Sequence, residues 1–228
     1  DSYSNVVEDN MVNGKPLVYL EGTSNLALED AGQVILVDCN NITIRNLNLS
    51  YTTVGVQLWQ SNNSTITNNS ITNNNIANHG YGIVLYYSSG NRISGNNITN
   101  NEFGIYFSSS NNNSVGRNNI TANSWFGIEL GYSQSNSISR NNITANSGYG
   151  IGLEWSSSNS ISENNITANS WFGVTLYYHS SNNIISGNNI TANSEYGIHL
   201  ASSSNNSISE NIITNNSLGV YLDSSSDN

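Results

Sequence analysis

Hydrophobic residues recur along this chain at intervals of 22 to 27 residues. One column of small aliphatic residues consists of Val34, Val56, Ile83, Ile105, Ile128, Ile151, Val174, Ile198 and Val220. Similar columns follow it two, ten and fifteen residues later, as at Leu85, Ile93 and Ile98. Within each repeat the apolar residues alternate with polar or small ones, as in the sequence FGIYF at 103–107. That alternation is the period of a β-strand.

This repeat predicts a β-solenoid. Each repeat holds two or three short strands separated by corners rich in Ser, Asn and Gly. A leucine-rich repeat has a similar period, but its Leu consensus is absent. We therefore expect an all-β fold, a single-stranded parallel β-helix of about ten coils of 22–24 residues. The chain is predicted to be one domain, 1–228, with less regular coils over 1–50 and regular repeats over 51–228.

Asparagine also recurs in register. The 46 Asn residues include one column represented by Asn96 and Asn118, and another represented by Asn101 and Asn123. Stacked Asn amides can form hydrogen-bonded ladders, and Asn tolerates the left-handed backbone of tight corners. A column of aromatic residues precedes the recurring glycine. It consists of Tyr81, Phe103, Phe126, Tyr149, Phe172 and Tyr196. Its phase predicts stacking inside the coil or at a corner; an aromatic strip that binds a ligand is the alternative.

Composition excludes several classes of protein. The chain has 5 Lys and Arg against 15 Asp and Glu, a net charge of −10. So few scattered cations cannot neutralise a phosphate backbone, which excludes nucleic-acid binding. No apolar run approaches the ~18 residues of a transmembrane segment. A single cysteine excludes an internal disulfide, and we expect Cys39 to be buried as a small apolar residue.

The repeat units resemble a known family. Residues 94–101 read SGNNITNN and residues 103–110 read FGIYFSSS. They look like the right-handed parallel β-helix repeats of the NosD-like, pectin-lyase-like group. The stretches 12–20 and 31–43 look like archaeal cell-surface members of it. The resemblance covers the whole chain and implies that the β-helix is right-handed. The usual chirality of parallel crossovers also favours this hand. The names in this group invoke copper-protein assembly or carbohydrate binding and hydrolysis.

No metal site or cofactor is expected from the donor residues. The soft ligands are His79, His179, His199, Met11 and Cys39, and no column of the repeat holds two of them. Copper sites need such residues to be clustered.

Glu129 and Glu154 are weak candidates for catalytic residues. Alternation points both outward, in adjacent coils and two positions apart, roughly 8 Å from each other, which is within the range of an inverting glycosidase. Solvated carboxylates that prevent sideways association are the alternative. In another outward column Arg140 and Glu163 fall on adjacent coils and are expected to pair.

Exposed aromatic residues offer a second kind of site. Trp59, Tyr86, Tyr106 and Tyr177 are predicted to point outward, where they could bind sugars. A third kind is modification. Five Asn-Ile-Thr sequons occupy one outward column, at Asn97, Asn119, Asn142, Asn165 and Asn189. These are the expected N-glycosylation sites, with partial occupancy because adjacent coils lie ~4.8 Å apart.

The sequence leaves three functions open. The favoured one is an extracellular or cell-surface structural protein, a glycosylated β-helix that stacks head to tail with copies of itself into a filament or sheath. The second is a carbohydrate-binding module, and the third is a glycan-cleaving enzyme. None of these three functions involves nucleic acid or a membrane-spanning segment.

Overall fold

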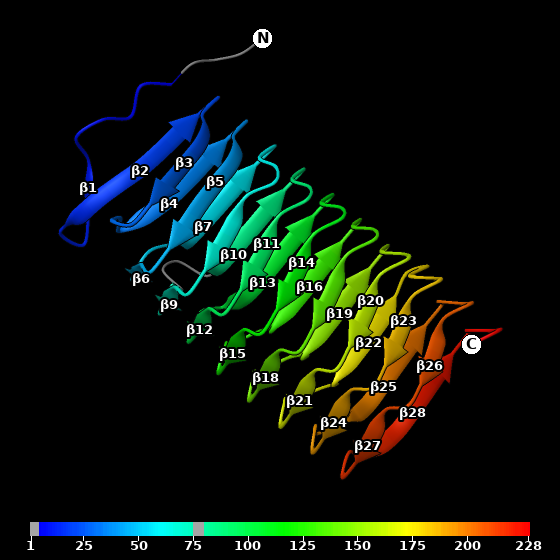
Figure 1. Ribbon diagram of the computed structural model, residues 1–228. Coiled ribbons are helices and arrows are strands. Elements are labelled where there is room, and N and C mark those ends of the chain that lie inside the picture. The colour runs from blue at the N-terminus through cyan, green and yellow to red at the C-terminus, as the bar shows by residue number, and fades with distance from the viewer. Residues whose placement is uncertain (1–4, 75–79) are drawn as a thin grey trace.

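The computed structural model describes residues 5–74 and 80–228, and every regular element within them is a β-strand. Strands from successive coils pair in parallel, so the chain winds into a β-helix (Figure 1). The exception is the short antiparallel hairpin of β1 (Met11–Val12) with β2. This confirms the predicted all-β parallel β-helix. None of the described residues forms a helix that could cross a membrane.

Three sheets run the length of the rod. After β1, the long sheet consists of β2 (Lys15–Glu21), β4 (Gln33–Val37), β7 (Val54–Trp59), β10 (Tyr81–Tyr86), β13 (Phe103–Ser108), β16 (Ile128–Gly131), β19 (Ile151–Glu154), β22 (Val174–Tyr177), β25 (Tyr196–Ala201) and β28 (Leu218–Asp223). The middle sheet consists of β3 (Ser24–Leu28), β5 (Asn40–Arg45), β8 (Thr65–Thr67), β11 (Arg92–Ser94), β14 (Ser114–Gly116), β17 (Ser137–Ser139), β20 (Ser160–Ser162), β23 (Ile184–Ser186) and β26 (Ser207–Ser209). The short sheet consists of β6 (Asn48–Ser50), β9 (Ser70–Thr72), β12 (Asn97–Thr99), β15 (Asn119–Thr121), β18 (Asn142–Thr144), β21 (Asn165–Thr167), β24 (Asn189–Thr191) and β27 (Ile212–Thr214).

The number of coils is lower than predicted. Complete three-strand coils run from β4–β5–β6 to β25–β26–β27, and the short sheet accordingly has 8 strands. The described part of the chain therefore has eight complete coils, not about ten. The first apolar residues form the β1–β2 hairpin instead of a coil, and β3 has no partner from the short sheet in its own coil.

The core is a stack of aliphatic side chains from all three sheets. Ile105 and Phe107 of β13, Val115 of β14 and Ile120 of β15 are completely buried, and their counterparts in the next coils pair with them in register. Burial of this apolar surface is the main force that holds the coils together.

Asparagine ladders line the inner corners. Asn141 shows the pattern, since its backbone N–H and its Nδ2 both donate to Oδ1 of Asn164 one coil later, at 3.0 Å. Both predicted columns form such ladders. A third Asn column, through Asn136, does the same. In a serine column through Ser133 the backbone N–H donates to Oγ of the serine one coil later. Among the described residues no buried side-chain nitrogen or oxygen lacks a hydrogen-bond partner.

Candidate functional site

The outer face of the long sheet carries a hollow of about 310 Å³, which we call the aromatic groove. The residues that line it are Phe126, Tyr149, Phe172, Thr175, Tyr177, Tyr178, His199, Ala201 and Ser202. They come from the ends of the long-sheet strands and from the corners beside them, so the groove extends across several coils.

A ladder of aromatic rings forms one wall of this groove. The centroids of Phe126 and Tyr149 lie 4.6 Å apart, those of Tyr149 and Phe172 5.2 Å apart, and those of Phe172 and Tyr196 5.0 Å apart, with interplanar angles of 10° or less. Toward the N-terminus the parallel stacking is interrupted, because Phe103 meets Phe126 edge-on at 5.6 Å, and it resumes between Phe103 and Tyr81, whose centroids lie 4.9 Å apart. Offset stacking of this kind is favourable.

The ladder lies at the corner that leads into the long sheet, which is one of the two predicted positions, and its rings point outward instead of into the coil. The glycine that follows each ring explains this outward direction. A Cβ atom on Gly82 would lie 2.7 Å from Cγ2 of the core residue Ile98, so Gly82 itself faces inward. Ile83 also faces inward, because it is fully buried. Two consecutive inward residues break the alternation and leave the ring of Tyr81 outside, in contact with Tyr106.

Glu129 lies under the groove rather than in solvent. Its side chain was expected to be exposed, but only 7% of the residue is accessible. Tyr177, two coils later, donates a hydrogen bond of 2.7 Å from its hydroxyl to Oε1 of Glu129. Gly152 occupies the intervening coil, and the absence of a side chain there gives the Tyr177 ring room to lean across.

The electrostatics of the groove follow from this burial. Burial raises the pKa of Glu129 to about 7, an effect that the Tyr177 hydroxyl opposes and the neighbouring Glu154 reinforces. The pKa of Tyr177 is also raised, first by burial and then by Glu129. Glu129 therefore exchanges its proton near neutral pH and can act as a donor or an acceptor of hydrogen bonds. No lysine or arginine lines the groove.

The positions of Glu129 and Glu154 confirm the predicted register, but the two side chains are not both exposed to solvent as predicted. Glu129 pairs with Gly152, and Glu154 pairs with Gly131, so the two carboxylates lie in adjacent coils and two positions apart. Glu154 is half-buried, whereas Glu129 is buried. The two carboxylates thus occupy different environments on one face, an arrangement typical of acid and base pairs.

The four predicted sugar-binding aromatics fall into two groups. Trp59, Tyr86 and Tyr106 form a cluster next to the groove, with centroid separations of 5.5 Å for Trp59–Tyr86 and 6.3 Å for Tyr86–Tyr106. Tyr177 lies in the groove itself. The sequence showed the ladder as a column, predicted inside the coil or at a corner, and the structure places it at the corner.

His199 completes one end of the groove. Its Nδ1 lies 3.3 Å from Oγ1 of Thr175, and its ring contacts Phe172 and Tyr196 with centroids 4.9 Å and 5.4 Å away. Burial lowers the pKa of this imidazole, so it is neutral at physiological pH and can accept or donate one hydrogen bond.

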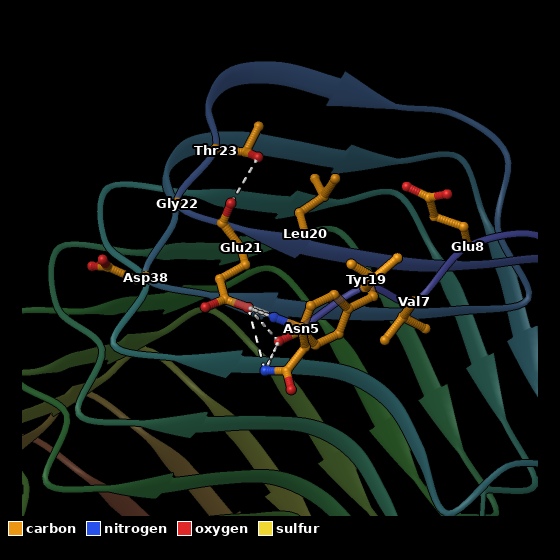
Figure 2. A pocket seen from close by; sticks show the side chains of 10 residues that line it. Asn5, Val7, Glu8, Tyr19, Leu20, Glu21, Gly22, Thr23 and Asp38 are labelled. Carbon is orange, nitrogen blue, oxygen red and sulfur yellow. Dashed lines mark hydrogen bonds between the residues drawn. The ribbon is translucent and has the colours of Figure 1, made fainter. Parts of the chain in front are cut away.

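A second hollow, of about 380 Å³, lies at the N-terminal end of the rod. Figure 2 shows Asn5 and Tyr19 directed at the Glu21 carboxylate there, with the Asn5 backbone N–H 3.0 Å and the Tyr19 hydroxyl 2.9 Å from Oε2. These hydrogen bonds, led by that from Asn5, lower the pKa of Glu21. The groups at this carboxylate already bind one another, so it offers less free bonding capacity than the aromatic groove.

The column of sequons lies on the outer face of the short sheet. Side chains of the five residues form their own ladder, in which Nδ2 of Asn119 donates to Oδ1 of Asn97 and Nδ2 of Asn142 donates to Oδ1 of Asn119, each at 2.8 Å. The ladder continues through Asn165 and Asn189. Asn97 and Asn189 are exposed and the three between them are half-buried. The column therefore faces outward, as predicted.

Comparison with known families decides the relationship of the chain. The model of the periplasmic copper-binding protein (NosD) family matches residues 1–143 and 76–228, which together span the whole sequence. The chain belongs to the NosD family. No curated protein matches it in sequence.

Solved structures share the fold of this NosD-family chain. A double mutant of the periplasmic alginate epimerase AlgG is 21% identical with a TM-score of 0.67, over 90% of this chain and 62% of the other. The A-module of a mannuronan C-5 epimerase from Azotobacter vinelandii is 17% identical with a TM-score of 0.57, over 89% and 73%. A DFA-IIIase from Arthrobacter chlorophenolicus A6 without its lid is 16% identical with a TM-score of 0.68, over 84% and 53%. The chain thus spans about three fifths of the length of the AlgG structure.

The soft donor residues that the structure describes in this NosD-family member lie apart from one another. Cys39 is buried, as predicted, and its thiol lies 3.3 Å from the Val37 carbonyl oxygen. Met11 is exposed on β1, His179 lies on a corner, and His199 lies in the groove. No group of three or more His, Cys, Asp or Glu side chains that could hold a metal exists within 5–74 and 80–228. His79 lies outside the described residues.

Proposed function

We propose that this chain is a polysaccharide-binding module of the cell envelope and that the aromatic groove is its binding site. The observation that carries this proposal is the ladder of Phe126, Tyr149, Phe172 and Tyr196, whose rings repeat at 4.6 to 5.2 Å along one wall of an open groove. Because the rings stack on one another, the wall presents a continuous apolar strip of ring edges, against which the apolar faces of pyranose rings can pack. A polymer needs a site that extends over several sugars.

The groove favours a neutral polysaccharide. Hydroxyl groups of a sugar can bond to Glu129, Tyr177 and His199, which together supply donors and acceptors near neutral pH. A polyuronate would bring one carboxylate per sugar toward Glu129 and Glu154, with no cation among the lining residues to compensate. Repulsion between these like charges disfavours the binding of a polyuronate.

The proposal is tested by affinity electrophoresis through gels that contain soluble neutral polysaccharides, with alginate as the polyanionic comparison. We expect retardation by at least one neutral polymer. Phe172→Ala should weaken it by up to about tenfold, because loss of an aromatic contact removes about 0.5–1.5 kcal/mol. Tyr51→Ala is the matched control, since Tyr51 is exposed on a corner outside the groove. Retardation by alginate alone, or equal effects of the two variants, would reject the proposal.

Glycan cleavage is a second candidate function, favoured by the raised pKa of Glu129 beside the less buried Glu154. A protonated carboxyl and an ionised one form the usual pair of a glycosidase. The β-helix enzymes with the same fold act on carbohydrates, as their names state, which supports this candidate only as an analogy of fold. If the polymer bound by the wild type is also cleaved, Glu129→Gln and Glu154→Gln should each abolish turnover while binding remains.

A structural role at the cell surface is the wider setting of this proposal. The periplasmic designation of the family supports a location in the envelope. N-glycosylation of the Asn97 column and head-to-tail stacking into filaments stay predictions. Mass spectrometry of native protein tests the first, with added mass expected on Asn97 or Asn189 before the half-buried residues between them. Negative-stain electron microscopy of the same sample tests the second.

A further inference from the structure

Most of the positive charge of this acidic protein gathers around one hollow. The chain has 5 Lys and Arg residues in total, and Arg92, Arg117 and Arg140 all line a single hollow of about 260 Å³ on the middle sheet. Arg92 begins β11, whereas Arg117 and Arg140 follow β14 and β17 at the corner that leads to the short sheet. Three of five cations in one place contrast with a net charge of −10.

The floor of this hollow is polar and open. Ser114, Gly116 and Ser139 complete its lining. Gly116 pairs with Ser139 in the next coil, and the absence of a side chain at Gly116 leaves space between the arginines. Neither the Ser114 nor the Ser139 hydroxyl forms a hydrogen bond with any of the described side chains or carbonyls. Both hydroxyls can therefore donate to a ligand.

The charges of two of the arginines are not neutralised within the described chain. Arg140 pairs with Glu163, with Nε 2.7 Å from Oε2, as the sequence predicted. The only other ion pair among the described residues is that of Arg45 with Glu29. Arg92 and Arg117 thus have no carboxylate partner there. Two guanidinium groups and a share of a third face the hollow.

The backbone at this corner is left-handed in successive coils. Arg117 and Arg140 have φ angles of 59° and 58°, Glu163 has the same conformation one coil later, and Gly95 lies one coil before Arg117. Glycine or asparagine adopts this conformation at lower cost than other residues. Arginine at two adjacent corners also brings like charges together. A bound anion would offset this repulsion.

We propose that Arg92, Arg117 and Arg140 bind an oxyanion, namely a sulfate or phosphate group that is either free or esterified to a sugar. The planar guanidinium group donates paired hydrogen bonds that match the oxygens of such groups. The hollow is larger than a single sulfate ion, so a sugar that carries the group fits within it. This site is on the middle sheet and is independent of the aromatic groove on the long sheet.

Isothermal titration calorimetry of the whole chain at low ionic strength tests the proposal. The probes are sodium sulfate, sodium phosphate and glucose 6-sulfate, with glucose as the neutral control. Equal affinity for sulfate and glucose 6-sulfate assigns the site to the free ion. Affinity for glucose 6-sulfate that is higher by about tenfold assigns it to the ester, since further contacts of ~1.4 kcal/mol give that factor. No heat of binding with any oxyanion overturns the proposal.

Three substitutions separate this site from general charge effects. Arg117→Gln should weaken binding by about fivefold or more, because it removes a charged donor. Arg45→Gln is the matched control, because it removes the same charge from the same sheet at a residue outside the hollow, and it should leave affinity unchanged. Glu163→Gln should strengthen binding by about twofold, because it releases Arg140. Equal losses in Arg117→Gln and Arg45→Gln would contradict the site.

Discussion

The long sheet and the short sheet belong to the same coils, and each points its own aliphatic residues into the core. Their outer faces differ completely. One column on the outer face of the short sheet is Asn in five successive coils, and its amides bond to each other. The outer face of the long sheet changes from Tyr106 to Glu129 to Gly152 to Thr175 to His199 along one column. Repetition gives a ladder whose amides bond mainly to one another, whereas variation gives a groove with a buried carboxyl. The difference teaches that in this rod the irregular face is the candidate site.

The largest expected effect is on the free energy of unfolding, and it distinguishes the inner Asn ladder from the outward one. Asn141→Ala leaves the buried N–H of Asn118 and the Val115 carbonyl without their partners. Since each such group costs about 1–3 kcal/mol, we expect a loss of about 3–5 kcal/mol in the free energy of unfolding. The adjacent Asn142→Ala affects only the outward ladder and should cost less than about 1 kcal/mol. Urea denaturation measures both; similar losses would show that the inner ladder has no special role.

Glu129 gives the next largest effect, and it depends on pH. Its pKa rises from the ordinary 4.5 to about 7 in the folded chain. The folded state therefore holds the proton more tightly than the unfolded state, and the stability of the wild type falls as pH rises from 4.5 through 7. Glu129→Gln cannot ionise and escapes this fall. We expect the variant to gain up to about 3 kcal/mol relative to the wild type between pH 4.5 and 8.

Denaturation at several pH values measures this gain. Glu210→Gln serves as the control, because Glu210 is an exposed corner residue. A constant difference between Glu129→Gln and the wild type at all pH values would mean that Glu129 is not held in a buried environment.

Tyr177→Phe is expected to have a smaller, pH-dependent effect on stability. It keeps the ring and removes the hydroxyl that donates to Glu129. We expect a loss of about 1–2 kcal/mol at pH 8, where the carboxylate needs that donor, and a smaller loss at pH 5. Thermal denaturation at the two pH values checks the direction. A larger loss at pH 5 would argue against a hydrogen bond to the ionised form.

The smallest effect is expected on the exposed surface. Arg140 and Glu163 are more than half exposed, so their pairing is screened by solvent. Glu163→Gln should leave the melting temperature unchanged within error, although it is expected to alter anion binding. A clear loss of stability would mean that this pair helps to set the register of the coils.

The sequence predicted the elements that repeat and missed those that do not. Columns such as Ile98 and Asn118 have one environment in every coil, so alternation and period place them correctly. For the ring of Tyr81 the sequence left an inner and a corner position open, because two consecutive inward residues, Gly82 and Ile83, break the alternation that would otherwise decide between them. Burial of Glu129 depends on a side chain two coils later and on the gap at Gly152. Such lateral contacts are absent from any pattern along the chain.

The most direct test of the binding proposal is an NMR titration of the chain with oligosaccharides of a neutral polymer that retards it in affinity electrophoresis. We predict that resonances of Tyr149, Phe172, Tyr177 and His199 shift with the added sugar, while the side-chain amides of the Asn97 to Asn189 ladder do not. Phe172→Ala should remove these shifts and Tyr51→Ala should keep them. Shifts confined to the short sheet, or shifts that persist in Phe172→Ala, would contradict the assignment of the aromatic groove.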